Sequence, residues 1–169
     1  MGNGTSIKCS HCNYEILLFE GIGMMMMPEE YECAPSMKPN GWDIVESKKI
    51  LKEVEEIMTN KKGKFISTCK DIPECLKGRF EEDSYFAYGY KVYYSNNTKK
   101  IYNLFYFIIR YEENGIVKYY EPNYVDKYRK PLKMLESSDE VYFYNVTCPK
   151  CKKNMDHKRN NVFTIINWD

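Results

Sequence analysis

The residues with the clearest chemistry are four of the seven cysteines, which form two C-x-x-C pairs. The first pair lies in Cys9-Ser10-His11-Cys12 and the second in Cys148-Pro149-Lys150-Cys151. Two residues between thiolates let both sulfurs of one tight turn converge on an ion, and a second such turn completes a tetrahedral site. The spacing therefore predicts a structural Zn²⁺ site with four ligands: Cys9, Cys12, Cys148 and Cys151.

The distance between the pairs along the chain is unusual. Residues 13–147 separate them, whereas ordinary zinc ribbons place the pairs about 15–20 residues apart. A long insert is physically allowed if it folds and returns, because the entropy cost of loop closure grows only slowly with length. We expect both pairs to share one ion, and four free or buried thiols without metal are the alternative.

Three other chemistries use the same residues. A disulfide framework fits poorly, because the cysteine count is odd and no secretory signal is recognised. A thioredoxin-like redox pair belongs at a helix N-terminus, whereas Val141–Tyr144 and Val162–Ile166, on either side of the second pair, are typical of strands. A rubredoxin-type iron site has the same ligands, but the glycine that usually follows such knuckles is missing after both pairs.

Other candidate ligands lack this organisation. His11 and His157 each lie near a cysteine pair, where a histidine can replace or hydrogen-bond a ligand, but we expect both to be solvated. The stretch Ser95-Asn96-Asn97-Thr98 has knuckle spacing with hydroxyls in place of thiols, and an ordinary polar hairpin loop explains it as well. The remaining cysteines are expected to be small buried residues or spare thiols: Cys33, Cys69 and Cys75.

Three segments carry a resemblance to known proteins: Ile7-Lys8-Cys9-Ser10-His11-Cys12-Asn13-Tyr14, Gly21-Ile22-Gly23-Met24, and the closing Cys148-Pro149-Lys150-Cys151. Through them the sequence resembles zinc-ribbon-containing proteins and, more loosely, small uncharacterised cytosolic proteins of low-GC bacteria. The resemblance implies a structural metal and often a binding surface, and it implies no catalytic residue.

The elements that must position these cysteines indicate an α+β fold, with a mostly antiparallel sheet and one main helix. Residues 5–20 are expected to form a hairpin arm around the first pair. A helix is predicted at about residues 44–60, with Asp43 or Ser47 as its cap, because apolar residues fall on one face: Ile50, Leu51, Val54, Ile57 and Met58.

The second half of the chain is predicted to be mainly β-structure. Residues 84–94 alternate, and residues 101–111 are apolar on both faces, which is typical of a central strand. Asn114-Gly115 is a strong hairpin signal. Irregular structure with a short helix is expected at 65–83, and a loop with one helical turn near 132–135. Further strands are expected at 116–120, 141–147 and 162–166.

Length and composition limit the architecture. With 169 residues, 43% hydrophobic and 29% charged, the chain is expected to fold as a single domain over 1–169, because this balance excludes wholesale disorder. A zinc-ribbon-like element would come from 5–20 and 141–167, and the helix and further strands would form an insert at 42–140. No apolar run reaches the ~18 residues needed to cross a membrane, so a cytoplasmic protein is expected.

The predicted function is that of a zinc-stabilised binding protein. A protein partner is favoured, and the candidate contact patch is Met24, Met25, Met26, Met27 and Trp42. Methionine adapts to partner surfaces, although such a run also fills gaps beneath a loop. The net charge of +1 excludes a protein that coats nucleic acid by charge alone.

Single-stranded nucleic acid is the alternative partner. A basic cluster around the second pair meets only one carboxylate, Asp156, and it lies near aromatic-rich strands: Lys150, Lys152, Lys153, Lys158 and Arg159. Cationic grooves with stacking rings hold single strands, although an exposed knuckle tip and an aromatic core explain the same residues.

An enzyme is the less favoured class. Four thiolates would close the metal site, whereas catalytic zinc keeps a position open for water. The sequence contains no P-loop, G-x-G-x-x-G, H-E-x-x-H or G-x-S-x-G motif. A site without a recognisable motif, or cysteine-based redox chemistry, is the remaining alternative.

Overall fold

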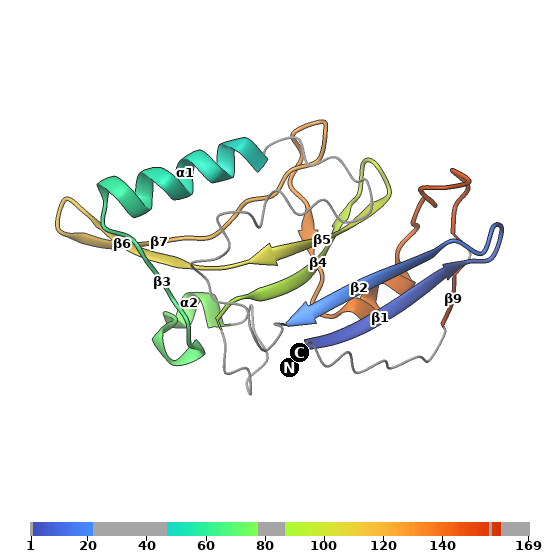
Figure 1. Ribbon diagram of the computed structural model, residues 1–169, viewed down its shortest axis with the longest axis horizontal. Helices are drawn as coiled ribbons and strands as arrows, with labels where there is room; N and C mark the ends of the chain where they lie inside the picture. The colour runs from blue at the N-terminus through green and yellow to red at the C-terminus, as the bar shows by residue number, and fades with distance from the viewer. Residues whose placement is uncertain (1, 22–46, 78–86, 156, 160–169) are drawn as a thin grey trace.

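The computed structural model describes residues 2–21, 47–77, 87–155 and 157–159 (Figure 1). The chain begins with an antiparallel hairpin of β1 (Gly2–Cys9) and β2 (Glu15–Gly21), and its turn contains the first cysteine pair. The predicted hairpin arm at 5–20 is therefore confirmed. β9 (His157–Arg159), which follows the second pair, lies antiparallel to β1 and places His157 opposite Cys9.

The larger sheet joins this hairpin to the middle of the chain. Its strand order is β5-β4-β2-β1-β9, with β4 at Gly89–Ser95 and β5 at Lys100–Tyr106. The short β8 (Lys133–Met134) also pairs with β4. All these pairs are antiparallel, so the predicted α+β class with a mostly antiparallel sheet is confirmed.

The junction between β2 and β4 is narrow. A single pair, Gly21 with Tyr90, forms the ladder there, and a Cβ on Gly89 would lie only 2.7 Å from the Gly21 carbonyl oxygen. Beyond this point the buried Asn103 amide replaces the ladder, because it accepts from the Phe19 N–H at 2.8 Å and donates to the Phe19 carbonyl at 2.7 Å. The Gly21–Tyr90 pair and the Asn103 side chain thus connect the β1–β2 hairpin to the rest of the sheet.

A smaller sheet and the main helix form the other end of the molecule. The strand order is β3-β6-β7, with β3 at Lys64–Phe65, β6 at Ile109–Glu113 and β7 at Ile116–Tyr120. α1 (Ser47–Asn60) lies across this region (Figure 1), and its Ile50 and Ile57 enter the same core cluster as Ile109. The predicted helix and the predicted Asn114-Gly115 turn are both confirmed.

The segment predicted as one central strand at 101–111 is in fact two strands in two sheets. β5 ends at Tyr106 and β6 begins at Ile109, with the buried Phe107 and Ile108 between them. The segment is apolar on both faces because it passes through the core where the two sheets meet. Its pattern therefore records burial rather than one continuous strand.

Two further predictions near the C-terminal half are wrong. Residues 141–147 are not a strand, because a 3₁₀ helix (Ser138–Phe143) turns Val141 inward and leaves Phe143 86% exposed. Residues 132–135 contain the short strand β8 rather than a helical turn, because Lys133 and Met134 pair with β4. Short helices at Cys69–Asp71 and Glu74–Lys77 lie within the expected irregular segment. The expected strand at 162–166 and residues 84–86 lie outside the described residues, whereas residues 89–94 of the strand expected at 84–94 belong to β4.

Candidate metal centre

The first knuckle is the turn of the β1–β2 hairpin. The Cys9 N–H donates to the Tyr14 carbonyl at 2.8 Å, and the Asn13 N–H donates to the Cys9 carbonyl at 2.9 Å. Asn13 closes the turn with φ of 57°, in the left-handed region that asparagine tolerates better than most residues. This geometry directs the Cys9 and Cys12 side chains to the same side.

The second knuckle repeats this backbone in a separate turn. The Cys148 N–H donates to the Lys153 carbonyl at 2.8 Å, and the Lys152 N–H donates to the Cys148 carbonyl at 3.0 Å. Lys152 has φ of 61° at the position equivalent to Asn13. Asparagine and lysine thus occupy the left-handed positions where a glycine was expected, so the missing glycines do not disfavour an iron ion.

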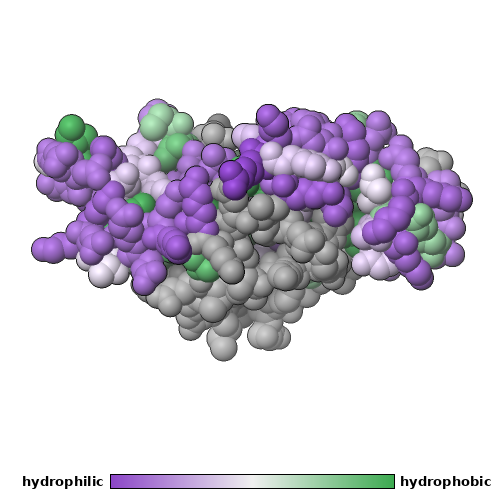
Figure 2. Space-filling view, turned by 90° about the horizontal axis from the view of Figure 1, so that it is seen from above, coloured by the Kyte–Doolittle hydropathy of each residue, from purple (hydrophilic) through white to green (hydrophobic). Residues whose placement is uncertain are grey.

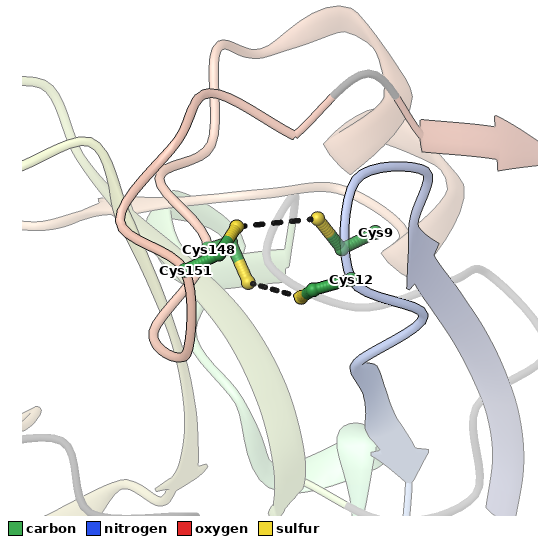
Figure 3. A group of neighbouring side chains, drawn as sticks. All are labelled: Cys9, Cys12, Cys148 and Cys151. Carbon is green, nitrogen blue, oxygen red and sulfur yellow. Dashed lines mark hydrogen bonds between the residues drawn. The ribbon is translucent and has the colours of Figure 1, made fainter.

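The four sulfurs meet in one cluster (Figure 3). All of them lie within 4.8 Å of one another, with Cys9 Sγ 3.8 Å from Cys151 Sγ and Cys12 Sγ 3.6 Å from Cys148 Sγ. A regular tetrahedron with metal–sulfur bonds of about 2.3 Å has edges of about 3.8 Å. The cluster therefore has the size of a four-thiolate metal site, and no histidine joins it among the described side chains.

Backbone N–H groups in each knuckle bond the sulfur of the first cysteine, but only in the first knuckle is the net pKa below the ordinary value. Burial raises the pKa of Cys9, but the backbone N–H groups of His11 and Cys12 bond its sulfur and bring the pKa below the ordinary value, to about 7. Burial also raises the pKa of Cys148, and there the N–H groups of Lys150 and Cys151 oppose burial only in part. A cation between the sulfurs would supply the missing stabilisation of the second thiolate.

Exposure divides the four ligand candidates into two kinds. Cys9 and Cys148 are fully buried, whereas Cys12 and Cys151 are half-buried. All four are free thiols, so the structure contains no disulfide among them. Neither pair lies at a helix N-terminus, because both are in hairpin-like turns, and this differs from the arrangement expected of a thioredoxin-like pair.

Cys69, Cys75 and His11 stay apart from the cluster. Cys69 lies in the 3₁₀ helix at 69–71, and burial raises the pKa of its thiol. Cys75 is exposed on α2 (Glu74–Lys77), and His11 is exposed as expected. Cys33 and the predicted contact patch Met24–Met27 with Trp42 lie outside the described residues.

Part of the predicted basic cluster surrounds the second knuckle. Lys150, Lys152 and Lys153 are exposed there. Of Lys158 and Arg159 the structure describes the backbone, which lies in β9 opposite Lys8 and Ile7 of β1. Four thiolates around a divalent ion carry net negative charge, so nearby lysines stabilise such a centre.

A third turn has the same backbone as the two knuckles. In Ser95–Lys99 the Lys99 N–H donates to the Ser95 carbonyl at 2.9 Å, and Lys99 has φ of 55°. The knuckle-like spacing of Ser95 and Thr98 is therefore matched by knuckle-like geometry, within the hairpin of β4 and β5. No motif in the sequence indicated Asp126, whose buried carboxylate accepts hydrogen bonds from Ser95 and Asn97 of this turn.

Comparisons with known proteins add no relative. No protein-family model matches the chain, and neither a curated protein nor a solved structure matches it significantly. None of the helices in the described ranges is both long and apolar enough to cross a membrane.

Proposed function

We propose that the four cysteines bind a structural Zn²⁺ ion and that the protein acts by binding another protein. The convergence of four sulfurs within 4.8 Å, from pairs separated by residues 13–147, carries the metal part of this proposal. Zinc has no geometric preference from its d-electrons and accepts a tetrahedron of thiolates. With four protein ligands no position stays open for water, so the ion would serve folding rather than catalysis.

The proposed ion would cross-link distant parts of the chain. Cys9 and Cys12 belong to the β1–β2 hairpin, whereas Cys148 and Cys151 lie between the 3₁₀ helix at 138–143 and β9. Among the described residues the hairpin reaches β4 through one residue pair and the Asn103 amide, and it reaches the C-terminal part of the chain through β9 and the Tyr142 hydroxyl, so the metal would add a cross-link to these contacts. Binding energy at such a site is folding free energy.

Metal analysis tests this part. Protein purified without added metal should contain one zinc per chain, and Cys9→Ser or Cys148→Ser should lose it and melt at lower temperature. Cys75→Ser is the matched control, because Cys75 is an exposed cysteine outside the cluster. A red protein that contains iron would contradict zinc, and full metal content in both knuckle variants would contradict the shared site.

The surface that best supports a protein partner is β7. It is the outer strand of the smaller sheet, and within the described residues no strand pairs with its free edge. Three of its residues are exposed apolar or aromatic side chains: Ile116 at 61%, Val117 at 40% and Tyr119 at 37%. Figure 2 shows apolar side chains at the end of the molecule that carries the β6–β7 hairpin. An exposed apolar edge is a template for another strand.

The turn defines which backbone groups of β7 face outward. Asn114 and Gly115 both have positive φ, 54° and 75°, so the hairpin closes with a two-residue type I′ turn. Glu113 and Ile116 are then a hydrogen-bonded pair, and pairs of this kind recur at every second residue. The N–H and C=O groups of Val117 and Tyr119 therefore point away from β6, toward an added strand.

We propose that the occupant is an extended segment of another protein, with an acidic residue between apolar ones. A second copy of this chain fits less well, because the antiparallel register that pairs both Val117 and Tyr119 places Lys118 opposite its own copy. Each Lys118 is paired with Glu113 of its own chain, and like charges directly opposite one another are still less favourable than a carboxylate opposite Lys118. The added strand would receive its affinity from main-chain hydrogen bonds and its specificity from these side chains.

A proline at one outward position tests strand addition. Val117→Pro removes an N–H that β6 does not use, so the hairpin should persist while binding of a short synthetic peptide of alternating valines around a central glutamate is lost. Val117→Thr keeps the N–H and is the matched control. Hydrogen exchange should show protection of the Val117 and Tyr119 amides by the peptide. Equal peptide binding by both variants would contradict this mode.

Single-stranded nucleic acid is a second candidate, favoured by the exposed Lys150, Lys152 and Lys153 around the metal site. The aromatic residues of the strands support it less, because several tyrosines that could stack on bases are core residues: Tyr88, Tyr93, Tyr94, Tyr102, Tyr106 and Tyr124. Lys152→Glu with Lys153→Glu should weaken binding of a single-stranded oligonucleotide. Absence of any gel shift by the wild-type protein at low salt would exclude this candidate.

A further inference from the structure

Asp126 is a buried carboxylate that has no counter-cation among the described residues. It is 1% exposed, and no lysine or arginine within the described residues forms an ion pair with it. Its charge is stabilised by hydrogen bonds on both oxygens. Oδ2 accepts from Ser95 Oγ at 2.8 Å and Asn97 Nδ2 at 3.2 Å, and Oδ1 accepts from the Tyr128 and Lys130 N–H groups at 2.8 and 3.0 Å.

The Oδ2 side of Asp126 fixes the turn at 95–99. Ser95 Oγ, which donates to the carboxylate, also accepts from the Thr98 N–H at 3.1 Å. The Asn97 amide donates to the same oxygen, so the side chains of Ser95 and Asn97 are both held by Asp126 Oδ2. The turn therefore has a defined position although it contains no metal ligand.

This turn in turn contacts the second cysteine knuckle. The Thr147 N–H donates to the Lys99 carbonyl at 2.7 Å, and Thr147 directly precedes the ligand candidate Cys148. A second link comes from the neighbouring Tyr94 hydroxyl, which donates to the Asn145 carbonyl at 2.7 Å. Two hydrogen bonds thus join the segment between the 3₁₀ helix and the second knuckle to the turn end of the β4–β5 hairpin.

We propose that Asp126 is a positioning residue of the metal centre, acting through the turn at 95–99 to place Cys148 and Cys151 against the first knuckle. The inference rests on the metal site proposed above. Metal affinity depends on ligands held in the productive geometry before the ion arrives, and groups behind the ligands change affinity by about 10–100-fold. Asp126 holds the turn at 95–99, and through it the second knuckle, in place in the metal-free protein, because its hydrogen bonds do not involve the ion.

Asp126→Asn should affect the contacts of the two carboxylate oxygens differently. The amide oxygen can still accept from the Tyr128 and Lys130 N–H groups, but the amide nitrogen then faces Asn97 Nδ2, which is itself a donor. The contacts with the turn at 95–99 should weaken while the turn at 126–130 persists, because Ser95 Oγ would have to accept from the amide instead of donating and Asn97 would have to turn its own amide over. Asp71→Asn is the matched control, because Asp71 accepts from Thr68 Oγ1 in the 3₁₀ helix beside α2, at the other end of the molecule (Figure 1).

The experiment measures zinc affinity by competition with a chromophoric chelator, together with hydrogen exchange of the metal-free protein. We expect Asp126→Asn to weaken zinc binding about tenfold and to accelerate exchange of the Thr147 amide, and Asp71→Asn to change neither. Asn97→Ala, which leaves the carboxylate intact, should give a smaller loss of affinity and serves if Asp126→Asn does not fold.

The outcomes separate the two proposals. Unchanged zinc affinity in Asp126→Asn and Asn97→Ala, with metal-free and zinc-bound protein destabilised equally, would overturn the positioning role and leave the zinc site intact. Absence of bound metal in the wild-type protein would overturn the zinc site and the positioning role together.

Discussion

Residues 95–99 and residues 148–152 form two turns with the same backbone hydrogen bonds. In each turn the N–H of the fifth residue donates to the carbonyl of the first, and the fifth residue is a lysine with φ near 60°. The first and fourth residues differ: Ser95 and Thr98 in one turn, Cys148 and Cys151 in the other. The serine turn is held by the Asp126 carboxylate, and the cysteine turn presents its sulfurs to the other knuckle.

The comparison shows that the turn conformation does not require a metal. In both turns the backbone conformation follows from closing the chain reversal. The side chains at the first and fourth positions determine whether a carboxylate or a metal ion stabilises the turn. A carboxylate fastens the serine turn permanently at neutral pH, whereas the thiols need both deprotonation and an ion. The serine turn is thus the fixed reference against which the second knuckle is placed.

The largest expected effect is removal of the metal from the cysteine turn. A strong chelator should lower the free energy of unfolding by several kcal/mol, against a typical domain stability of about 5–15 kcal/mol. The turn at 95–99 should stay protected in the hydrogen exchange of its Thr98 amide, because its fastening is independent of the ion. Two measurements check the prediction: thermal denaturation with and without chelator, and the exchange rate of the Thr98 amide under the same two conditions. Loss of protection at both turns would show that they are not independent.

The next effect is removal of the carboxylate. Asp126→Ala should destabilise the metal-free protein by about 2–3 kcal/mol, because several buried donors lose their acceptor together. Ser95→Ala, which removes one of these donors, should cost about 1 kcal/mol. Urea denaturation of chelator-treated protein gives both values. An Asp126→Ala variant as stable as the wild type would mean that water replaces the carboxylate.

The carboxylate contact of the serine turn and the metal ligation of the cysteine turn should be lost at different pH values on acidification. Burial raises the pKa of Asp126, but hydrogen bonds from the Lys130 N–H, Ser95 Oγ, the Tyr128 N–H and Asn97 Nδ2 outweigh it and leave the pKa below its ordinary value. A depressed carboxyl pKa contributes stability that is present above the unfolded value of about 3.9 and is lost as the pH falls through the folded value. Thiolate ligands need a higher pH, because protons compete with the ion.

We therefore expect the metal to leave first on acidification, and the contribution of Asp126 to disappear only below about pH 4. Zinc release is followed with a chelating dye, and the melting temperature of the metal-free protein is followed in parallel. The difference between wild type and Asp126→Asn isolates this carboxylate from other acids. A wild-type advantage that vanishes well above pH 4 would contradict the depressed pKa.

The smallest effect concerns the left-handed lysine that the two turns share. Lys152→Gly and Lys99→Gly should each stabilise the protein by up to about 1 kcal/mol, because glycine adopts positive φ without the penalty of a Cβ. Asn13→Gly should gain less, since asparagine already tolerates this region. Lys153→Gly is the control, because Lys153 is not among the residues with positive φ. Thermal denaturation of the metal-loaded variants gives the order.

Much of the candidate site follows from local sequence. The spacing of Cys9 with Cys12 and of Cys148 with Cys151 defines two turns, because a turn of this length involves only neighbouring residues. The same holds for α1, whose apolar face repeats every turn, and for Asn114-Gly115, where two positive φ values suit these two residues. These patterns predicted the α+β class and both cysteine turns.

Tertiary structure decided everything that depends on distant partners. It brought Cys9 opposite Cys151, divided 101–111 between two sheets, and turned 138–143 into a 3₁₀ helix. It also placed the carboxylate of Asp126 under Ser95, a contact between residues whose sequence neighbours carry no sign of it. Local periodicity reports which side of an element is buried but not what buries it, so these pairings become visible only when the chain is folded.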